Sequence, residues 1–75
     1  MRVKFSRHAK RRASLYQVPE STIGDILADL EVTDGEHELI IDIAGFKYPI
    51  KIVFSVEADS VTVITSYPLK KGRSQ

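Results

Sequence analysis

The sequence predicts an α+β domain of order β-α-α-β-β-β, in which two helices pack on one face of an antiparallel β-meander. Three observations lead to this fold class. Apolar residues between positions 20 and 30 recur with the 3.6-residue period of a helix, whereas those between positions 39 and 67 alternate with the two-residue period of strands. Turn residues, of which Asp34-Gly35 is the clearest case, separate the two regimes.

A short strand and two helices are expected in the first part of the chain. Residues 2–5 alternate basic and apolar side chains, which is typical of a strand. Ser6 can cap a helix over residues 7–16, because its hydroxyl can accept a hydrogen bond from a free N–H of the first turn. Val18-Pro19 interrupts the helical pattern, and residues 20–30 then form the second helix.

Three strands are expected in the second half of the chain. Residues 39–43, 46–56 and 61–67 each alternate apolar and polar side chains. Ala44-Gly45 and residues 57–60 supply the turns between them. These strands form the meander that the helices cover.

The middle strand contains Pro49, which has no N–H to donate to a sheet. We therefore expect this strand to lie at an edge of the sheet or to bulge at Pro49. Its apolar face would meet the helices, which leaves the opposite face, with Lys47 and Lys51, open to solvent or a partner.

Size and composition restrict the class of protein. The chain has 75 residues, which predicts a single domain over residues 1–69, followed by a basic flexible tail over residues 70–75. There is no cysteine, so a disulfide framework and a thiolate metal site are excluded, and a reducing cytoplasm is the expected location. The basic N-terminus has no apolar run behind it, so we expect no signal peptide. No apolar stretch approaches the roughly 20 residues that span a bilayer, and no membrane partner is expected.

The net charge of +1 conceals a strong segregation of charge. Six of the eleven basic residues lie within residues 1–12, and all ten acidic residues lie between Glu20 and Asp59. This pattern indicates a basic patch for a polyanion, although a solvated helix face and a frayed tail would give the same pattern. The candidate nucleic-acid-binding residues are Arg7, Lys10, Arg11, Lys47, Lys70, Lys71 and Arg73.

His8 and Arg12 break the pattern of the first helix. On a helical wheel they share an arc with Leu15 and Ala9, and their i, i+4 spacing makes them neighbours on one face. One interpretation is a site where the helix meets the sheet, in which the imidazole moves a proton and the guanidinium holds a phosphate. The other is a hydrogen-bonded histidine and an arginine that extends its charged end to water.

Two segments carry a resemblance to a known family. The sequence F-S-R-H-A-K-R-R-A occupies positions 5–13 and is followed by Val18-Pro19-Glu20, and V-I-T-S-Y occupies positions 63–67. Together they resemble a family of small uncharacterised bacterial and archaeal domains that open with F-S-x-H-A-x-x-R. That family is similar to the BrnT and RelE group of toxin-like proteins. The resemblance covers nearly the whole chain and singles out His8 and Arg12.

The resemblance implies a RelE-like fold and a function in RNA binding, together with an antitoxin protein as partner. The leading hypothesis is a RelE/BrnT-like toxin-family protein that binds RNA. Whether it also cleaves RNA, by a reaction that needs no metal ion, is left open. In such a reaction His8 would be the acid/base, Arg12 and Lys51 would bind phosphate, and Tyr67 or Lys71 would be a supporting donor.

Two hypotheses of other classes stay open. One is a non-catalytic interaction module that binds an acidic partner protein or a nucleic-acid backbone. The other is a structural homodimer that uses the strand of Pro49 or the open sheet face. No cofactor is expected, because the chain has no glycine-rich phosphate loop. No metal is expected either, because His8 and His37 lie on separate elements without a clear carboxylate cluster.

Overall fold

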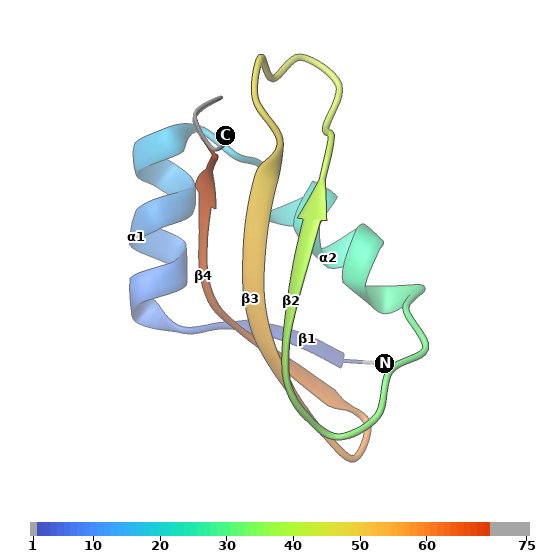
Figure 1. The fold of residues 1–75 in the computed structure, drawn as a ribbon. Coiled ribbons are helices and arrows are strands. Elements are labelled where there is room, and N and C mark those ends of the chain that lie inside the picture. The colour runs from blue at the N-terminus through green and yellow to red at the C-terminus, as the bar shows by residue number, and fades with distance from the viewer. Residues whose placement is uncertain (1, 70–75) are drawn as a thin grey trace.

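The computed structural model describes residues 2–69 and contains two helices and one four-stranded sheet (Figure 1). The predicted order β-α-α-β-β-β is confirmed. The elements are β1 (Arg2–Phe5), α1 (Arg7–Tyr16), α2 (Glu20–Ala28), β2 (Gly35–Ile41), β3 (Ile50–Glu57) and β4 (Ser60–Pro68).

The strands lie in the order β1-β4-β3-β2. The pairs β2–β3 and β3–β4 are antiparallel, which confirms the expected meander, and β1 joins it as a fourth strand parallel to β4. The sheet is therefore mixed rather than purely antiparallel. Its two edges are β1 and β2.

Both helices cover the same face of the sheet (Figure 1). The core lies between the helices and this face. Ala9 and Ala13 are the buried residues of α1, and their small side chains let this helix lie close to β4. Ile23 and Leu27 are the buried residues of α2. The strands complete the core with Ile50, Ile52, Phe54, Val56, Val61 and Val63.

A β-bulge in β4 changes the face that its side chains occupy. Val63 pairs with Phe54, but the next pair along the ladder is Thr65 with Val53, so Ile64 is the extra residue. An unbroken strand would place Tyr67 on the same face as Val63. The bulge instead moves Thr65 and Tyr67 to the face opposite the helices.

Ser6 fixes the chain where β1 ends, α1 begins and β4 bulges. Its N–H donates to the carbonyl of Val63 at 3.0 Å. Its hydroxyl accepts from the N–H of Ala9 at 3.0 Å and donates to the carbonyl of Ile64 at 3.1 Å. The predicted N-cap is confirmed, and the same side chain also provides a partner for the carbonyl of the bulged residue.

Pro49 does not have the role that we expected. It lies just before β3, which begins at Ile50 rather than at Phe46, and β3 is an inner strand between β4 and β2. Because proline has no N–H, it is excluded from the ladder but accommodated at its start. Its carbonyl accepts from the N–H of Leu69 at 2.8 Å, which extends the β3–β4 pairing.

Two other predicted boundaries shift. The second helix ends at Ala28 instead of Leu30, because Leu30 closes a tighter turn by donating its N–H to the carbonyl of Leu27. The strand expected over residues 39–43 begins at Gly35 and ends at Ile41, because residues 35–38 also pair with β3. Pairing with a neighbouring strand thus overrides the local turn signal at Asp34-Gly35.

Candidate nucleic-acid interface

The face of the sheet that the helices leave uncovered is called the open face below. Its members follow from the strand register, because paired residues share a face. They are Arg2 and Lys4 of β1, Glu36, Glu38 and Ile40 of β2, Lys51, Val53, Ser55 and Glu57 of β3, and Ser60, Thr62, Thr65 and Tyr67 of β4.

Helix α1 carries a dense set of cations. Arg7, Lys10 and Arg11 are exposed, and Arg12 is half-buried. The helix contains no acidic residue. Within residues 2–69 the one ion pair is between Lys51 and Glu38, so no carboxylate neutralises the cations of α1.

The predicted arc of His8 and Arg12 is only half right. Ala9 and Ala13 set the buried direction of α1, whereas His8 is exposed and Leu15 is 63% exposed. The wheel placed His8 and Leu15 too close to the core because it centred the inner face on large side chains. The side of α1 that contacts β4 consists of the small side chains of Ala9 and Ala13, because they allow a close approach.

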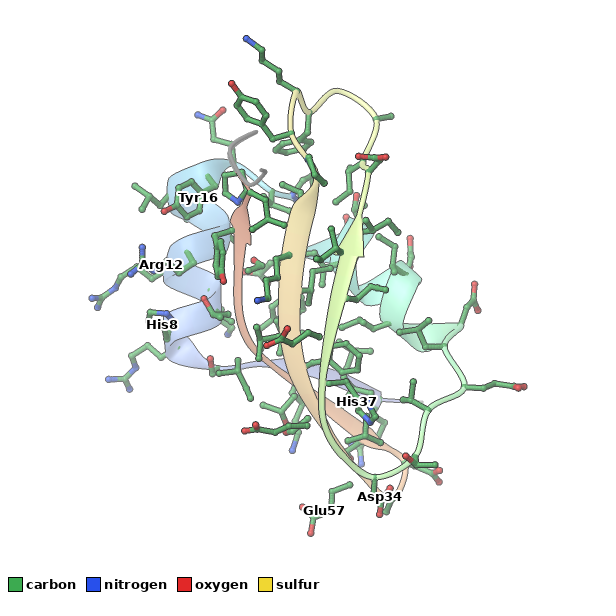
Figure 2. All side chains as sticks on the ribbon, in the orientation of Figure 1. His8, Arg12, Tyr16, Asp34, His37 and Glu57 are labelled. Atoms are coloured by element: carbon green, nitrogen blue, oxygen red, sulfur yellow. The ribbon has the colours of Figure 1, made fainter. Side chains whose placement is uncertain are left out.

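Arg12 lies at the boundary between α1 and the open face. Its Nη1 donates to the hydroxyl of Tyr16 at 3.4 Å. His8, Arg12 and Tyr16 are spaced i, i+4, i+8, and Figure 2 shows them in a line along the side of α1 that is turned toward the viewer, as the open face is. Arg12 is therefore half-buried and hydrogen-bonded to Tyr16, and its role as a phosphate binder stays a prediction.

Lys51 and Tyr67 come together on the open face. They are directly paired residues of β3 and β4, and the bulge at Ile64 is what brings Tyr67 to this side. The Nζ of Lys51 lies 3.2 Å from Oε1 of Glu38 on β2. The hydrogen bond to Glu38, then the charge of its carboxylate, and then Tyr67 raise the pKa of Lys51 above its ordinary value of 10.5.

This ion pair predicts a stability difference that depends on pH. A pKa raised in the folded state stabilises the fold fully below the unfolded pKa, and the contribution is lost as pH rises through the folded value. We expect the difference in free energy of unfolding between the wild type and Lys51→Met to be constant up to about pH 10 and to shrink above it. Urea unfolding between pH 8 and 11.5 measures this difference.

The control for this experiment is the same substitution in a Glu38→Gln background. Without the carboxylate, Lys51→Met should give a difference that changes much less with pH, because only the smaller effect of Tyr67 on the pKa of Lys51 remains. An equal pH dependence in both backgrounds would show that Glu38 is not the partner that matters.

The predicted site residues thus form two groups on one side of the molecule. His8 and Arg12 lie on α1, and Lys51 and Tyr67 lie on the open face. No hydrogen bond or ion pair within residues 2–69 joins the two groups. Lys47 lies in the β2–β3 connection, away from the start of α1, with its Nζ 5.6 Å from the centre of the Tyr48 ring (Figure 1). Lys70, Lys71 and Arg73 lie outside the described residues, as does the predicted tail.

Two residues of this surface were missed in the sequence. Tyr16 is not among the predicted site residues, although its i+4 spacing from Arg12 is a signal for a contact. Glu38 is not among them either, and only the β2–β3 register reveals it as the partner of Lys51.

Neither a metal centre nor a membrane span is found in the described part of the chain. Residues 2–69 contain no cluster of three or more histidine, aspartate or glutamate side chains arranged to hold a metal ion. None of the helices in this range has the length and apolar character needed to cross a bilayer. Comparisons of the chain with models of protein families, with curated proteins and with solved structures find no match.

Proposed function

We propose that this protein binds the phosphodiester backbone of RNA through α1 and the adjoining open face, as a RelE/BrnT-like protein. The observation that carries the proposal is the set of cations on α1, which no carboxylate among residues 2–69 neutralises. Such a surface attracts a polyanion by releasing its counterions.

The arrangement of these cations opposes helix stability. The N-terminus of a helix is the positive end of its dipole and favours acidic residues, but α1 begins with Arg7 and has Lys10 in its first turn. Arg7 and Arg11 are also like charges at i, i+4 spacing, which repel. Binding of a phosphate chain would relieve both costs, which supports a role in anion binding over a solvated helix face.

Further groups suit a nucleic acid rather than a simple anion. The phenol of Tyr16 lies beside Arg12 and that of Tyr67 beside Lys51, and the open face adds the hydroxyls of Thr62 and Thr65. Aromatic rings and hydroxyls beside basic residues are typical of single-strand binding. The resemblance of residues 5–13 to the F-S-x-H-A-x-x-R pattern also implies RNA.

The same residues support metal-independent cleavage as the second part of the proposal. The exposed imidazole of His8 would remove the proton of a ribose 2′-hydroxyl, and the 2′-oxygen would attack the adjacent phosphorus. The 5′-oxygen of the next nucleotide would leave with a proton donated by the Tyr67 phenol, which regains one from water, and the products are a 2′,3′-cyclic phosphate and a free 5′-hydroxyl. Arg12 and Lys51 would stabilise the charge on the phosphorane, and Tyr67 would be the supporting donor.

Binding is tested with a fluorescent single-stranded RNA of 20 nucleotides. We expect the logarithm of the association constant to fall with the logarithm of salt concentration with a slope of about −3, as four phosphate contacts would give. A slope near zero would indicate an interaction module for acidic proteins instead. So would a polyglutamate peptide that binds with the same affinity as the RNA and displaces it.

Cleavage is tested on the same RNA in the presence of EDTA. We expect His8→Ala and Arg12→Ala each to lower the rate by roughly tenfold or more, since acid/base and charge-stabilising groups contribute at least that much. Circular dichroism verifies that both variants are folded, and Ser14→Ala is the control on the same helix. Variants that match the wild type would exclude these two residues as the catalytic pair, and RNA binding without turnover would leave a binding protein.

A further inference from the structure

The β2 strand forms an edge of the sheet that is open to another strand. It is the last strand in the order β1-β4-β3-β2, and it lies against β3 on one side only. Within residues 2–69, no backbone hydrogen bond outside the β2–β3 ladder involves residues 35–41. The N–H and C=O groups on its outer side therefore have no protein partner there, which is the condition for strand addition.

This edge lacks most devices that prevent strand addition. Residues 35–41 contain no proline and no lysine, and their pairing with β3 runs without a register shift. Ile40 is 57% exposed on the open face. Leu39 and Ile41, which point to the core side, are only half-buried, whereas Ile50 and Ile52 of β3 are fully buried. A strand added to β2 would cover the apolar surface that remains.

The chemistry of the edge selects the side chains of the incoming strand. Glu36 and Glu38 lie two residues apart on the open face, and both are exposed. They line a shallow hollow of about 250 Å³ together with His37 and Val53. Residues of an added strand that oppose them would have Cβ atoms about 5 Å away, so a basic residue opposite Glu36 would form a favourable cross-strand pair, and one opposite Glu38 would share that carboxylate with Lys51. The positions between them would face the core side, where Leu39 favours an apolar side chain.

A second copy of β2 does not meet these requirements. Antiparallel pairing of two β2 strands centred on His37 sets Glu36 against Glu38, and pairing centred on Glu38 sets two Glu38 carboxylates against each other. Like charges in direct opposition destabilise a strand pair. A nucleic acid is disfavoured for the same reason, since this edge repels a polyanion.

We propose that the outer edge of β2 binds an extended segment of a partner protein that alternates basic and apolar residues. The segment adds to the sheet as a fifth strand, with its basic side chains over Glu36 and Glu38 and its apolar side chains beside Leu39. The edge of β2 lies two strands away from β4, the strand that α1 contacts.

The test uses a capped seven-residue peptide that alternates lysine and valine, the length of β2. We expect NMR titration to shift and protect the amides of residues 35–41, and Glu36→Gln with Glu38→Gln to weaken binding about fivefold. The same peptide with glutamate in place of lysine should not bind, and a peptide of the same composition without alternation should bind more weakly.

Backbone methylation separates strand addition from charge attraction. In a strand, the N–H groups of alternate residues point to opposite edges. N-methylation of the valines or of the lysines should therefore abolish binding in one of the two peptides and preserve it in the other. Equal binding of both methylated peptides would overturn the proposal. So would a lack of binding combined with a molecular mass that doubles with concentration, which would assign the edge to a second copy.

Discussion

Replacement of Phe54 by alanine should lower the free energy of unfolding by about 3–5 kcal/mol, the range for removal of a buried aromatic side chain. Phe54 is 1% exposed and has the largest of the fully buried side chains. Its ring stacks on His37 of β2, with centroids 5.5 Å apart, and it pairs with Val63 of β4 beside the bulge. The cavity would therefore affect three strands at once.

The size of this effect matters because the domain is small. Domains of this length bury a modest fraction of their surface and have little stability in reserve, on the order of 5 kcal/mol. We expect thermal and urea unfolding to show Phe54→Ala as marginally stable at room temperature, with about 0–2 kcal/mol left, and Phe54→Leu as folded with a loss of about 1 kcal/mol. A Phe54→Ala variant as stable as the leucine variant would mean that the core closes around the missing ring.

Reversal of two charges at the start of α1 should change stability and RNA binding in opposite directions. The variant Arg7→Glu/Lys10→Glu places acidic residues in the first turn, where they complement the helix dipole. Glutamate at position 7 also stands four residues before Arg11, the favourable orientation for a pair on a helix. Both positions are exposed, so no packing is lost, and we expect the free energy of unfolding to rise by about 1 kcal/mol.

The affinity of this variant for RNA should fall on the order of 100-fold near 0.1 M salt, because two phosphate contacts become repulsive. Urea unfolding and fluorescence anisotropy measure the two quantities on the same preparation. The matched comparison is Arg7→Glu against Lys47→Glu, since each changes the charge equally and Lys47 lies in the β2–β3 connection. Equal losses of affinity would show that the interface is not centred on α1, and a loss of stability in the double variant would refute the electrostatic account of the helix.

The local elements were largely predictable from the sequence. Ser6 was identified as an N-cap because hydroxyl capping depends on neighbouring backbone groups alone, and the structure confirms its bond to Ala9. The break at Val18-Pro19 and the two helices follow from proline chemistry and the 3.6-residue period in the same way. The excess of positive charge in the first twelve residues was likewise predictable from the sequence, because counting charges requires no knowledge of tertiary contacts.

The faces of these elements were less predictable. His8 was expected near the core and is exposed, because α1 meets β4 through alanines rather than through its larger apolar residues. Pro49 was expected at an edge and precedes an inner strand, because its position in the ladder depends on which strands neighbour β3. Each error concerns a contact between elements that lie apart in the sequence.

By itself, the sequence determined the order of the elements, the caps and turns, and the segregation of charge between the two parts of the chain. These properties depend on residues within one or two helical turns of each other. The tertiary structure alone decided that Ile64 bulges, that Tyr67 consequently joins Lys51 and Glu38 on the open face, and that β2 ends the sheet. The physical reason is that a strand's register and its neighbours are set by backbone pairing over long separations, and one extra residue exchanges the two faces of everything that follows.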